Sequence, residues 1–216
     1  MKLSKDTLAI LKNFASINGN IKVEPGNRLK TISAARNVLA VAEVAETFSK
    51  EFCIYDLGGF LNSVTLFDDA DLQFGDDSVL ITAGNTVTKW RYSPPAIIVA
   101  PEKDPKIDTD PNVKFSITAD DLAKLNRGAS AVNGDTIKIT TKGNKVVLEA
   151  LDDRTTVNVF KMTLTTKEEL KEGEYCLKRQ NMNFIVGDYD VAIWDMGISQ
   201  FTGKENAVQY FVSLEK

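Results

Sequence analysis

The sequence feature that most constrains the fold is a segment that occurs twice. LSKDTLAILKNFASIN, at residues 3–18, returns in altered form as ITADDLAKLNRGASAVN at residues 117–133. Each copy places a hydroxyl residue, Ser4 or Thr118, before an acidic first turn and an apolar stripe at helical spacing, and each ends in Asn-Gly before a strand-like sequence. We interpret the two segments as parts of a structural repeat of about 110 residues. A chance resemblance between two amphipathic helices is the alternative.

Each copy predicts an amphipathic helix with a small, basic outward face. Ser4 is the expected N-cap of the first helix, and Thr118 with Asp121 resembles a capping box at the second. The first apolar face is expected to be Leu8, Leu11, Phe14 or Ala15, and Ile17, and its outward face Lys5, Ala9, Lys12 and Ser16. The second apolar stripe is expected to be Leu122, Leu125, Ala129 and Val132, and its outward positions Ala119, Ala123, Asn126 and Ser130, flanked by Lys124 and Arg127.

Most of the remaining sequence predicts β-strands. NVLAVAEV, FSKEFCIY, DLQF, SVLITA, TVTKWRY and IIVA in the first half are rich in β-branched and aromatic residues, and several alternate with period two. TIKIT, KVVLEAL, TVNVFKMTLT, YDVAIWDM and AVQYFVSL repeat this pattern in the second half. Gly75-Asp76-Asp77 and Gly84-Asn85 predict antiparallel hairpins. Trp90 and Trp194 lie in apolar strands and are expected in the core.

Two further helices are expected, one in each half. In YDLGGFLNSVTLF, Asp56 is the expected cap, and the apolar stripe is Leu57, Phe60, Leu61 and Val64. Its counterpart is expected near residues 174–182, which contain Lys178 and Arg179, although the apolar stripe there is poor.

The composition excludes several kinds of chemistry. The 216 residues contain no histidine, which rules out Ser-His and Cys-His nucleophile pairs and removes the commonest transition-metal ligand. Cys53 and Cys176 lie in separate halves without metal-like spacing, so two reduced thiols are expected. DDADLQFGDD lacks the register of a calcium loop, and no phosphate-binding glycine loop is complete. We therefore expect a binding protein with no cofactor or metal, rather than an enzyme.

Charge and hydropathy restrict the partners. The formal net charge of −4 does not by itself indicate nucleic-acid binding. No run approaches the ~18 apolar residues of a membrane helix, and no signal-peptide pattern is present, so no membrane partner is expected.

A proline-rich stretch divides the chain. SPPAIIVAPEKDPKIDTDPNVKF holds five of the six prolines around a polar centre, and proline disfavours both helix and central strand. The sequence therefore predicts an N-terminal domain over residues 1–100, an extended connector over 101–112 and a C-terminal domain over 113–216.

Several of these segments together resemble the sliding clamps of T-even-type bacteriophages. The matching elements in the first half are MKLSKDTLAILKNFASIN, IYDLGGFL, DDADL, TVTKW and VAPEK, in order and well spaced. The second half fits more loosely, through the repeated helix, GDYDVAIW and AVQYFVSLEK. The resemblance implies an α+β clamp fold, similar to that of proliferating cell nuclear antigen, with two similar domains, antiparallel sheets outside and helices lining a central hole.

The same resemblance implies a homotrimeric ring that encircles duplex DNA and tethers the phage DNA polymerase. An ATP-dependent clamp loader is the further implied partner, late transcription a second implied process, and the cytoplasm of the infected bacterial host the implied location. The repeated helices would furnish equivalent parts of one inner wall, whose cations meet phosphates without reading bases. The residues expected to face DNA are Lys5, Lys12, Lys124, Arg127, Lys178 and Arg179; for each, an ordinary solvated charge is the alternative.

Clamp partners generally insert a short apolar segment into a groove beside the connector. The resemblance therefore implies a groove that uses Ile97, Ile98, Val99, Pro101, Ile107, Tyr210 and Phe211. Simple packing of these side chains on the sheets is the alternative. Two other classes of protein remain open: an oligomeric, β-rich phage virion or tail protein, and a carboxylate-dependent enzyme such as a glycosidase, for which no paired carboxylate motif is present.

Overall fold

The computed structural model describes residues 1–67, 69–103, 107–152, 154 and 158–215. The chain divides into two compact units, Met1–Asp104 and Pro105–Lys216. Unit 1 contains α1 (Lys5–Ile17), β1 (Ile21–Val23), β2 (Gly26–Ile32), β3 (Val38–Phe48), β4 (Phe52–Ile54), α2 (Leu57–Thr65), β5 (Asp71–Phe74), β6 (Ser78–Ala83), β7 (Thr86–Arg91) and a 3₁₀ turn (Pro95–Ile97). Unit 2 contains β8 (Val113–Ile117), α3 (Ala119–Ala131), β9 (Thr136–Leu151), β10 (Val159–Lys178), a 3₁₀ turn (Arg179–Asn181), β11 (Tyr189–Trp194), β12 (Ile198–Gly203) and β13 (Val208–Ser213).

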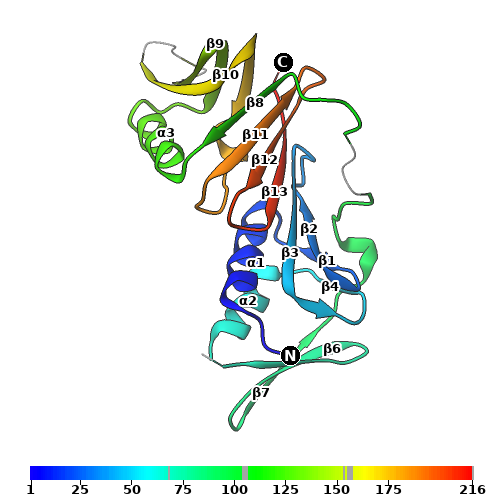
Figure 1. The fold of residues 1–216 in the computed structure, drawn as a ribbon. Helices are drawn as coiled ribbons and strands as arrows, with labels where there is room; N and C mark the ends of the chain where they lie inside the picture. The colour runs from blue at the N-terminus through cyan, green and yellow to red at the C-terminus, as the bar shows by residue number, and fades with distance from the viewer. Residues whose placement is uncertain (68, 104–106, 153, 155–157, 216) are drawn as a thin grey trace. The chain divides into compact units, whose positions relative to one another are not determined.

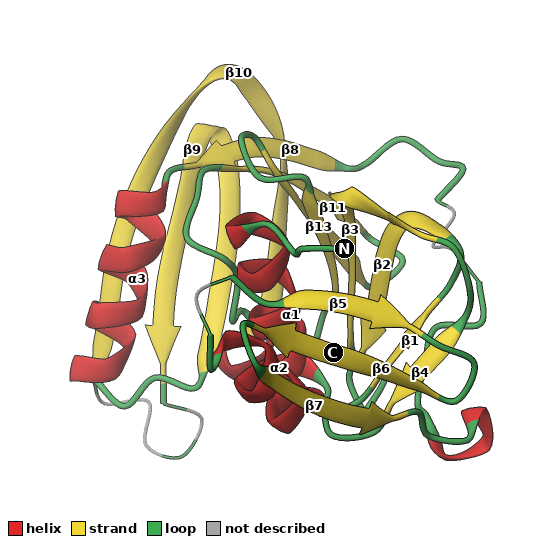
Figure 2. Cartoon of the chain, turned by 90° about the horizontal axis from the view of Figure 1, so that it is seen from below, coloured by secondary structure: helices red, strands yellow, loops and turns green. Residues whose placement is uncertain are grey.

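Unit 1 is built from antiparallel strand pairs and two neighbouring helices. β1 pairs with β4, β2 with β3, and β5, β6 and β7 form a meander whose turns are the two predicted hairpins (Figure 2). α1 and α2 lie side by side (Figure 1). The predicted cap and stripe of α2 are confirmed, because Asp56 accepts a hydrogen bond from the N–H of Gly59 and all four stripe residues are buried.

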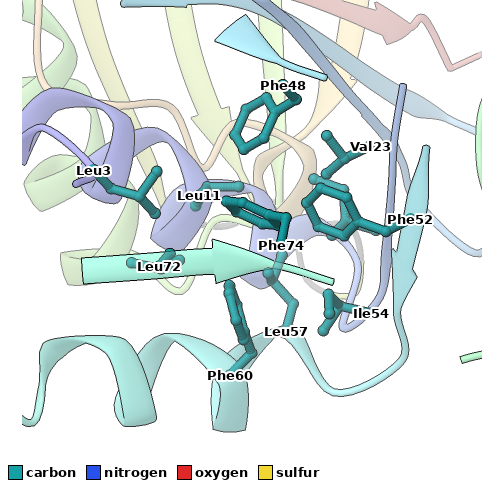
Figure 3. Close-up of a pocket in the computed structure, with 11 residues that line it drawn as sticks. Leu3, Leu11, Val23, Phe48, Phe52, Ile54, Leu57, Phe60, Leu72 and Phe74 are labelled. Atoms are coloured by element: carbon teal, nitrogen blue, oxygen red, sulfur yellow. The ribbon is translucent and has the colours of Figure 1, made fainter. Parts of the chain in front are cut away.

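A cluster of apolar side chains lies between α1, α2 and the strands of unit 1. Side chains from α1, α2 and the strands converge in one cluster, in which Leu11, Phe52 and Phe74 lie close together (Figure 3). Phe52 and Phe74 have ring centroids 5.0 Å apart. Burial of each such side chain contributes about 1.5–3 kcal/mol, so this cluster fixes the inner side of α1.

Unit 2 consists of a four-stranded antiparallel sheet and a long hairpin. The sheet has the order β13–β12–β11–β8, and β9 pairs with β10. α3 lies along the β9–β10 ladder (Figure 1). The ring of Phe160 on β10 rests on Gly128 of α3, where a β-carbon would lie 2.3 Å from the ring. Only glycine permits this close approach of helix and strand.

The structure corrects three secondary-structure predictions. The helix expected near residues 174–182 is instead the end of β10 followed by the 3₁₀ turn, because Tyr175 and Leu177 alternate inward and their strand pairs with β9. IIVA is not a strand, since the N–H groups of Ile97 and Ile98 return to the carbonyls of Pro94 and Pro95. FSKEFCIY is interrupted, with β3 ending at Phe48 and β4 beginning at Phe52.

Burial of individual side chains also differs in part from expectation. On α1, Thr7 and Ile10 are buried with Leu11 and Phe14, whereas Leu8 and Ile17 are half-buried. On α3, Leu125 and Ala129 are buried, and Leu122 and Val132 are half-buried. Trp194 is in the core as predicted, but Trp90 is half-buried and packs edge to face on Phe60 at 5.9 Å.

Candidate nucleic-acid interface

The outward face of α1 carries cations on small neighbours. Lys5, Ala9, Lys12 and Ser16 are all exposed or half-buried, and both lysines are exposed, as their spacing predicts. The helix is fixed on its other side, where Phe14 is 0% exposed and Leu11 4%. α1 therefore presents two lysines on one helical face, on a surface without bulky side chains.

The N-terminus of α1 is anchored by a carboxylate from a distant strand. The Ser4 hydroxyl accepts a hydrogen bond from the N–H of Thr7 at 3.1 Å, which confirms the predicted cap. Glu46 on β3 accepts from the N–H of Ser4 at 2.5 Å and from the hydroxyl of Thr7. Burial alone would raise the pKa of Glu46, but the hydrogen bonds from Thr7 and Ser4 outweigh it and hold the pKa below 4.5. An ionised carboxylate thus sits at the positive end of the helix dipole.

The outward face of α3 is similar. The Thr118 hydroxyl accepts from the N–H of Asp121 at 3.1 Å, and Asp188 accepts from the N–H of Ala119 at 2.8 Å, so two side chains satisfy the start of the helix. The two cations Lys124 and Arg127 are exposed, as are Asn126 and Ser130. Ala119 and Ala123 are half-buried.

Lys178 is the last residue of β10 and Arg179 the first of the 3₁₀ turn, so neither lies on the expected helix. Both side chains bond to residues at or just after the C-terminal end of α3. The Lys178 ammonium donates to the Thr136 hydroxyl at 3.1 Å. The Arg179 guanidinium donates to the Ser130 hydroxyl at 2.5 Å and to the Gly134 carbonyl at 3.4 Å. Arg179 therefore contacts the exposed face of α3 through Ser130. This contact was not predicted, because the sequence placed Arg179 on a separate helix.

An open hollow of ≈ 850 Å³ lies at this end of α3. Two of its lining residues, Arg154 and Arg179, are cationic, and Asp135 is the single carboxylate among them. The remaining lining residues are mostly amides and hydroxyls: Asn126, Ser130, Asn133, Gly134, Gln180, Met182 and Asn183. Donors of this kind suit phosphate oxygens without base-specific contacts. Arg154 was not identified from the sequence, because it belongs to no helical repeat.

The residues expected to form a partner groove differ in exposure. Ile97 is 52% exposed and Val99 37% exposed, whereas Ile98, Pro101 and Ile107 are half-buried. Tyr210 and Phe211 are buried in unit 2. Tyr210 packs on Phe184 with ring centroids 4.6 Å apart and accepts from the N–H of Ile185, and its burial raises its pKa. Both tyrosine and phenylalanine are core residues there.

Within the described residues, no three His, Cys, Asp or Glu side chains are grouped to hold a metal ion. Cys53 and Cys176 are free thiols, as predicted. None of the described helices has the length and apolar character needed to cross a bilayer.

Comparison with known proteins identifies phage relatives. A family model described as gp45 sliding clamp, C terminal, matches residues 114–216. The sliding clamp of Enterobacteria phage T4 is 32% identical over 224 residues, covering 100% of this chain and 97% of that protein. The sliding clamp of Escherichia phage RB69 is 31% identical, with coverage of 100% and 97%, and that of Vibrio phage KVP40 is 29% identical, with 100% and 99%.

Solved structures with a similar fold include a PCNA2–PCNA3 complex and a proliferating cellular nuclear antigen. The PCNA2–PCNA3 complex of Sulfolobus tokodaii aligns with a TM-score of 0.73 at 13% identity, covering 99% of this chain and 98% of that one. Proliferating cellular nuclear antigen of Entamoeba histolytica aligns with a TM-score of 0.70 at 15% identity, covering 97% and 94%. At these identities the likeness concerns the fold, and it confirms the predicted α+β clamp fold.

The phage relatives decide between the classes that the sequence left open. They do not favour a virion or tail protein, and the expectation of a non-enzymatic protein is confirmed, because sliding clamps are processivity factors without catalytic activity. With two relatives above 30% identity along its whole length, this chain belongs to the gp45 sliding-clamp family of bacteriophages.

Proposed function

We propose that this chain assembles into a closed homotrimer that encircles duplex DNA and tethers the phage DNA polymerase during replication. The single observation that carries the proposal is the pair of similar helices, α1 and α3, each with an outward face of small, polar and cationic side chains, in a member of the sliding-clamp family. The proposed domains are residues 1–100 and 113–216, joined by the connector 101–112.

The proposed inner wall uses Lys5, Lys12, Lys124, Arg127, Lys178 and Arg179. Three chains carry 3 × −4 = −12 formal charges in total. Because screening acts over ~10 Å at 0.1 M salt, acidic groups elsewhere on the ring are largely masked from phosphates at the wall. Local lysines and arginines then determine the potential that DNA meets. Contacts of this kind are weak and independent of sequence, so the ring can slide.

Ring closure is proposed through edge strands of neighbouring subunits. β7 is at the edge of the β5–β6–β7 sheet, and Val87 on it is 62% exposed. In the described part of unit 2 the β9–β10 ladder has no third strand, and Val159 on β10 is 45% exposed. Pairing of β7 with β10 of the next subunit would satisfy both edges in a head-to-tail ring.

The remaining partners follow from the ring. A closed ring needs an ATP-driven loader to open it on DNA, and the exposed residues Ile97 and Val99 beside the connector are the proposed contact for partner segments. The same contact is proposed to serve a role in late transcription. The proposed location is the cytoplasm of the infected host.

Primer extension with the cognate polymerase and loader tests the function. We expect longer products on a circular template, and loss of this gain on a linear template whose free ends let a ring slide off. Equal stimulation on both templates, or a strictly monomeric chain by light scattering at high micromolar concentration, would contradict a topological clamp.

A further inference from the structure

The turn that ends α1 holds Val99, just before the connector, through two asparagine side chains. The side-chain N–H₂ of Asn18 donates to the carbonyl of Val99 at 2.9 Å and to the carbonyl of Ile32 at 2.8 Å. The side-chain oxygen of Asn20 accepts from the N–H of Val99 at 3.0 Å. Both backbone polar groups of Val99 are therefore bound by side chains 79 and 81 residues away in the sequence.

The orientation of Asn18 is determined by its surroundings. Its amide donates to two carbonyl oxygens, and its own oxygen accepts from the N–H of Asn20 at 3.2 Å. A reversed amide would place oxygen against two carbonyls and leave the N–H of Asn20 facing a donor, so only one orientation satisfies the network. Asn18 is 9% exposed, which makes each of these hydrogen bonds costly to lose.

The same segment has few backbone donors left for a partner. Residues 94–101 read PPAIIVAP, so three of eight residues are prolines and five carry an N–H. Three of those five are bound within unit 1: Ile97 to Pro94, Ile98 to Pro95, and Val99 to Asn20. A partner strand needs a row of open donors and acceptors to pair with, and this segment does not offer one. Its side chains are available, because Ile97 is 52% and Val99 37% exposed.

We propose that Asn18 and Asn20 are positioning residues for partner binding: they fix the backbone at Val99 so that Ile97 and Val99 present apolar side chains to a partner segment. The partner binds by side-chain contact and not by strand addition to residues 94–101. This inference rests on the proposed clamp function, and it specifies how the segment before the connector is recognised. The fitting partner is a short peptide segment with aliphatic or aromatic anchors.

The test uses the full-length protein and two matched substitutions at Asn20. Asn20→Ala removes the acceptor for the N–H of Val99, and Asn20→Asp retains an oxygen at the same place. Amide hydrogen exchange at Val99 reports the hydrogen bond directly. We expect faster exchange in Asn20→Ala and near-native exchange in Asn20→Asp.

The functional readout is the dissociation constant for the cognate phage DNA polymerase. Loss of one positioning hydrogen bond is expected to weaken binding about fivefold in Asn20→Ala, equivalent to about 1 kcal/mol, with recovery in Asn20→Asp. Ile97→Ala, which removes a proposed anchor, is expected to weaken binding about fivefold or more.

Each of the other possible results would disprove one part of the proposal. Unchanged exchange at Val99 in Asn20→Ala would disprove the hydrogen bond from Val99 to Asn20, and faster exchange with unchanged polymerase affinity would disprove its positioning role. Native affinity in Ile97→Ala would disprove side-chain recognition at Ile97 while leaving the clamp function intact. Failure of the wild-type protein to retain polymerase on circular DNA would instead refute the proposed function itself.

Discussion

The carboxylate of Glu46 accepts a hydrogen bond from the backbone N–H of Ser4 at 2.5 Å, and this hydrogen bond joins β3 to the residue that caps α1. Glu46 also accepts from the hydroxyl of Thr7, so one side chain satisfies two groups at the start of the helix. The orientation of the cationic face of α1 therefore depends on a residue 42 positions away in the sequence.

Glu46→Gln is expected to lower the free energy of unfolding by about 1.5–3 kcal/mol, because hydrogen bonds to a charged acceptor are lost and an amide N–H₂ is placed among donors. Urea denaturation followed by circular dichroism measures the change. Glu43→Gln, at an exposed position of the same strand, is the control and should be nearly neutral.

Glu46 also predicts a pH dependence of stability. Its pKa in the folded protein is held below 4.5, so the contribution of its ionised form is fully present above the unfolded pKa and is lost as the pH falls through the folded pKa. Wild-type stability should therefore fall more steeply than that of Glu46→Gln on acidification below about pH 4.5. Parallel curves over that range would mean that Glu46 ionises equally in both states.

Gly128→Ala should destabilise unit 2, although alanine normally favours a helix over glycine by about 1 kcal/mol. The added β-carbon would lie 2.3 Å from the Phe160 ring, and overpacking of this kind costs about 1–3 kcal/mol or more. In a Phe160→Ala background the same substitution should become stabilising, because the obstruction is gone. Thermal unfolding of wild type, the two single variants and the double variant gives a double-mutant cycle. An equal effect of Gly128→Ala in both backgrounds would contradict the close approach of ring and helix.

Replacing Lys5 and Lys12 together by alanine should weaken binding to duplex DNA and flatten its salt dependence. Each phosphate that is no longer neutralised reduces the slope of log K against log salt by about 0.9. Fluorescence anisotropy of a labelled duplex across a salt series measures this. The control is Lys142→Ala with Lys167→Ala, two exposed lysines of the β9–β10 hairpin with the same change in charge. If both double variants had the same slope of log K against log salt, α1 would not face the DNA.

Tyr175 reports on a polar cluster that includes the connector end at Asn112, whose side chain donates to Asp195 at 2.8 Å. Burial, together with its hydrogen bond to Asp195 at 3.0 Å and the charge of that carboxylate, raises the pKa of Tyr175 to about 12. Asp195→Asn should lower this pKa toward 10, measured by NMR of labelled tyrosine rings. Asp190→Asn, whose carboxylate pairs with Lys204, should leave it unchanged.

Local patterns predicted the elements that local forces determine. The caps Ser4, Thr118 and Asp56 and the outward faces of α1 and α3 follow from helical periodicity and from hydrogen bonds within one turn. The hairpins at Gly75 and Gly84 follow from turn chemistry in the same way. The clamp family was indicated separately, by the resemblance of segments such as MKLSKDTLAILKNFASIN and IYDLGGFL to the sliding clamps of T-even-type bacteriophages.

Such local patterns could not predict which segments pair over long distances in the sequence. The end of β10 contains helix-compatible residues, yet it is a strand because β9 offers a ladder and Tyr175 and Leu177 are buried against it. IIVA has strand-like composition, but prolines on both sides and short-range hydrogen bonds keep it out of a sheet. Tertiary context overrode propensity in both places.

The sequence by itself determined where the repeated helices begin, which face of each is cationic, and which chemistry a chain without histidine must forgo. Only the tertiary structure decided which distant groups hold those helices and the segment before the connector: Glu46 at Ser4, Phe160 at Gly128, and Asn18 with Asn20 at Val99. The reason is that a cap or an amphipathic stripe is set by residues within one or two turns, whereas a hydrogen bond across tens of residues exists only after the chain has folded.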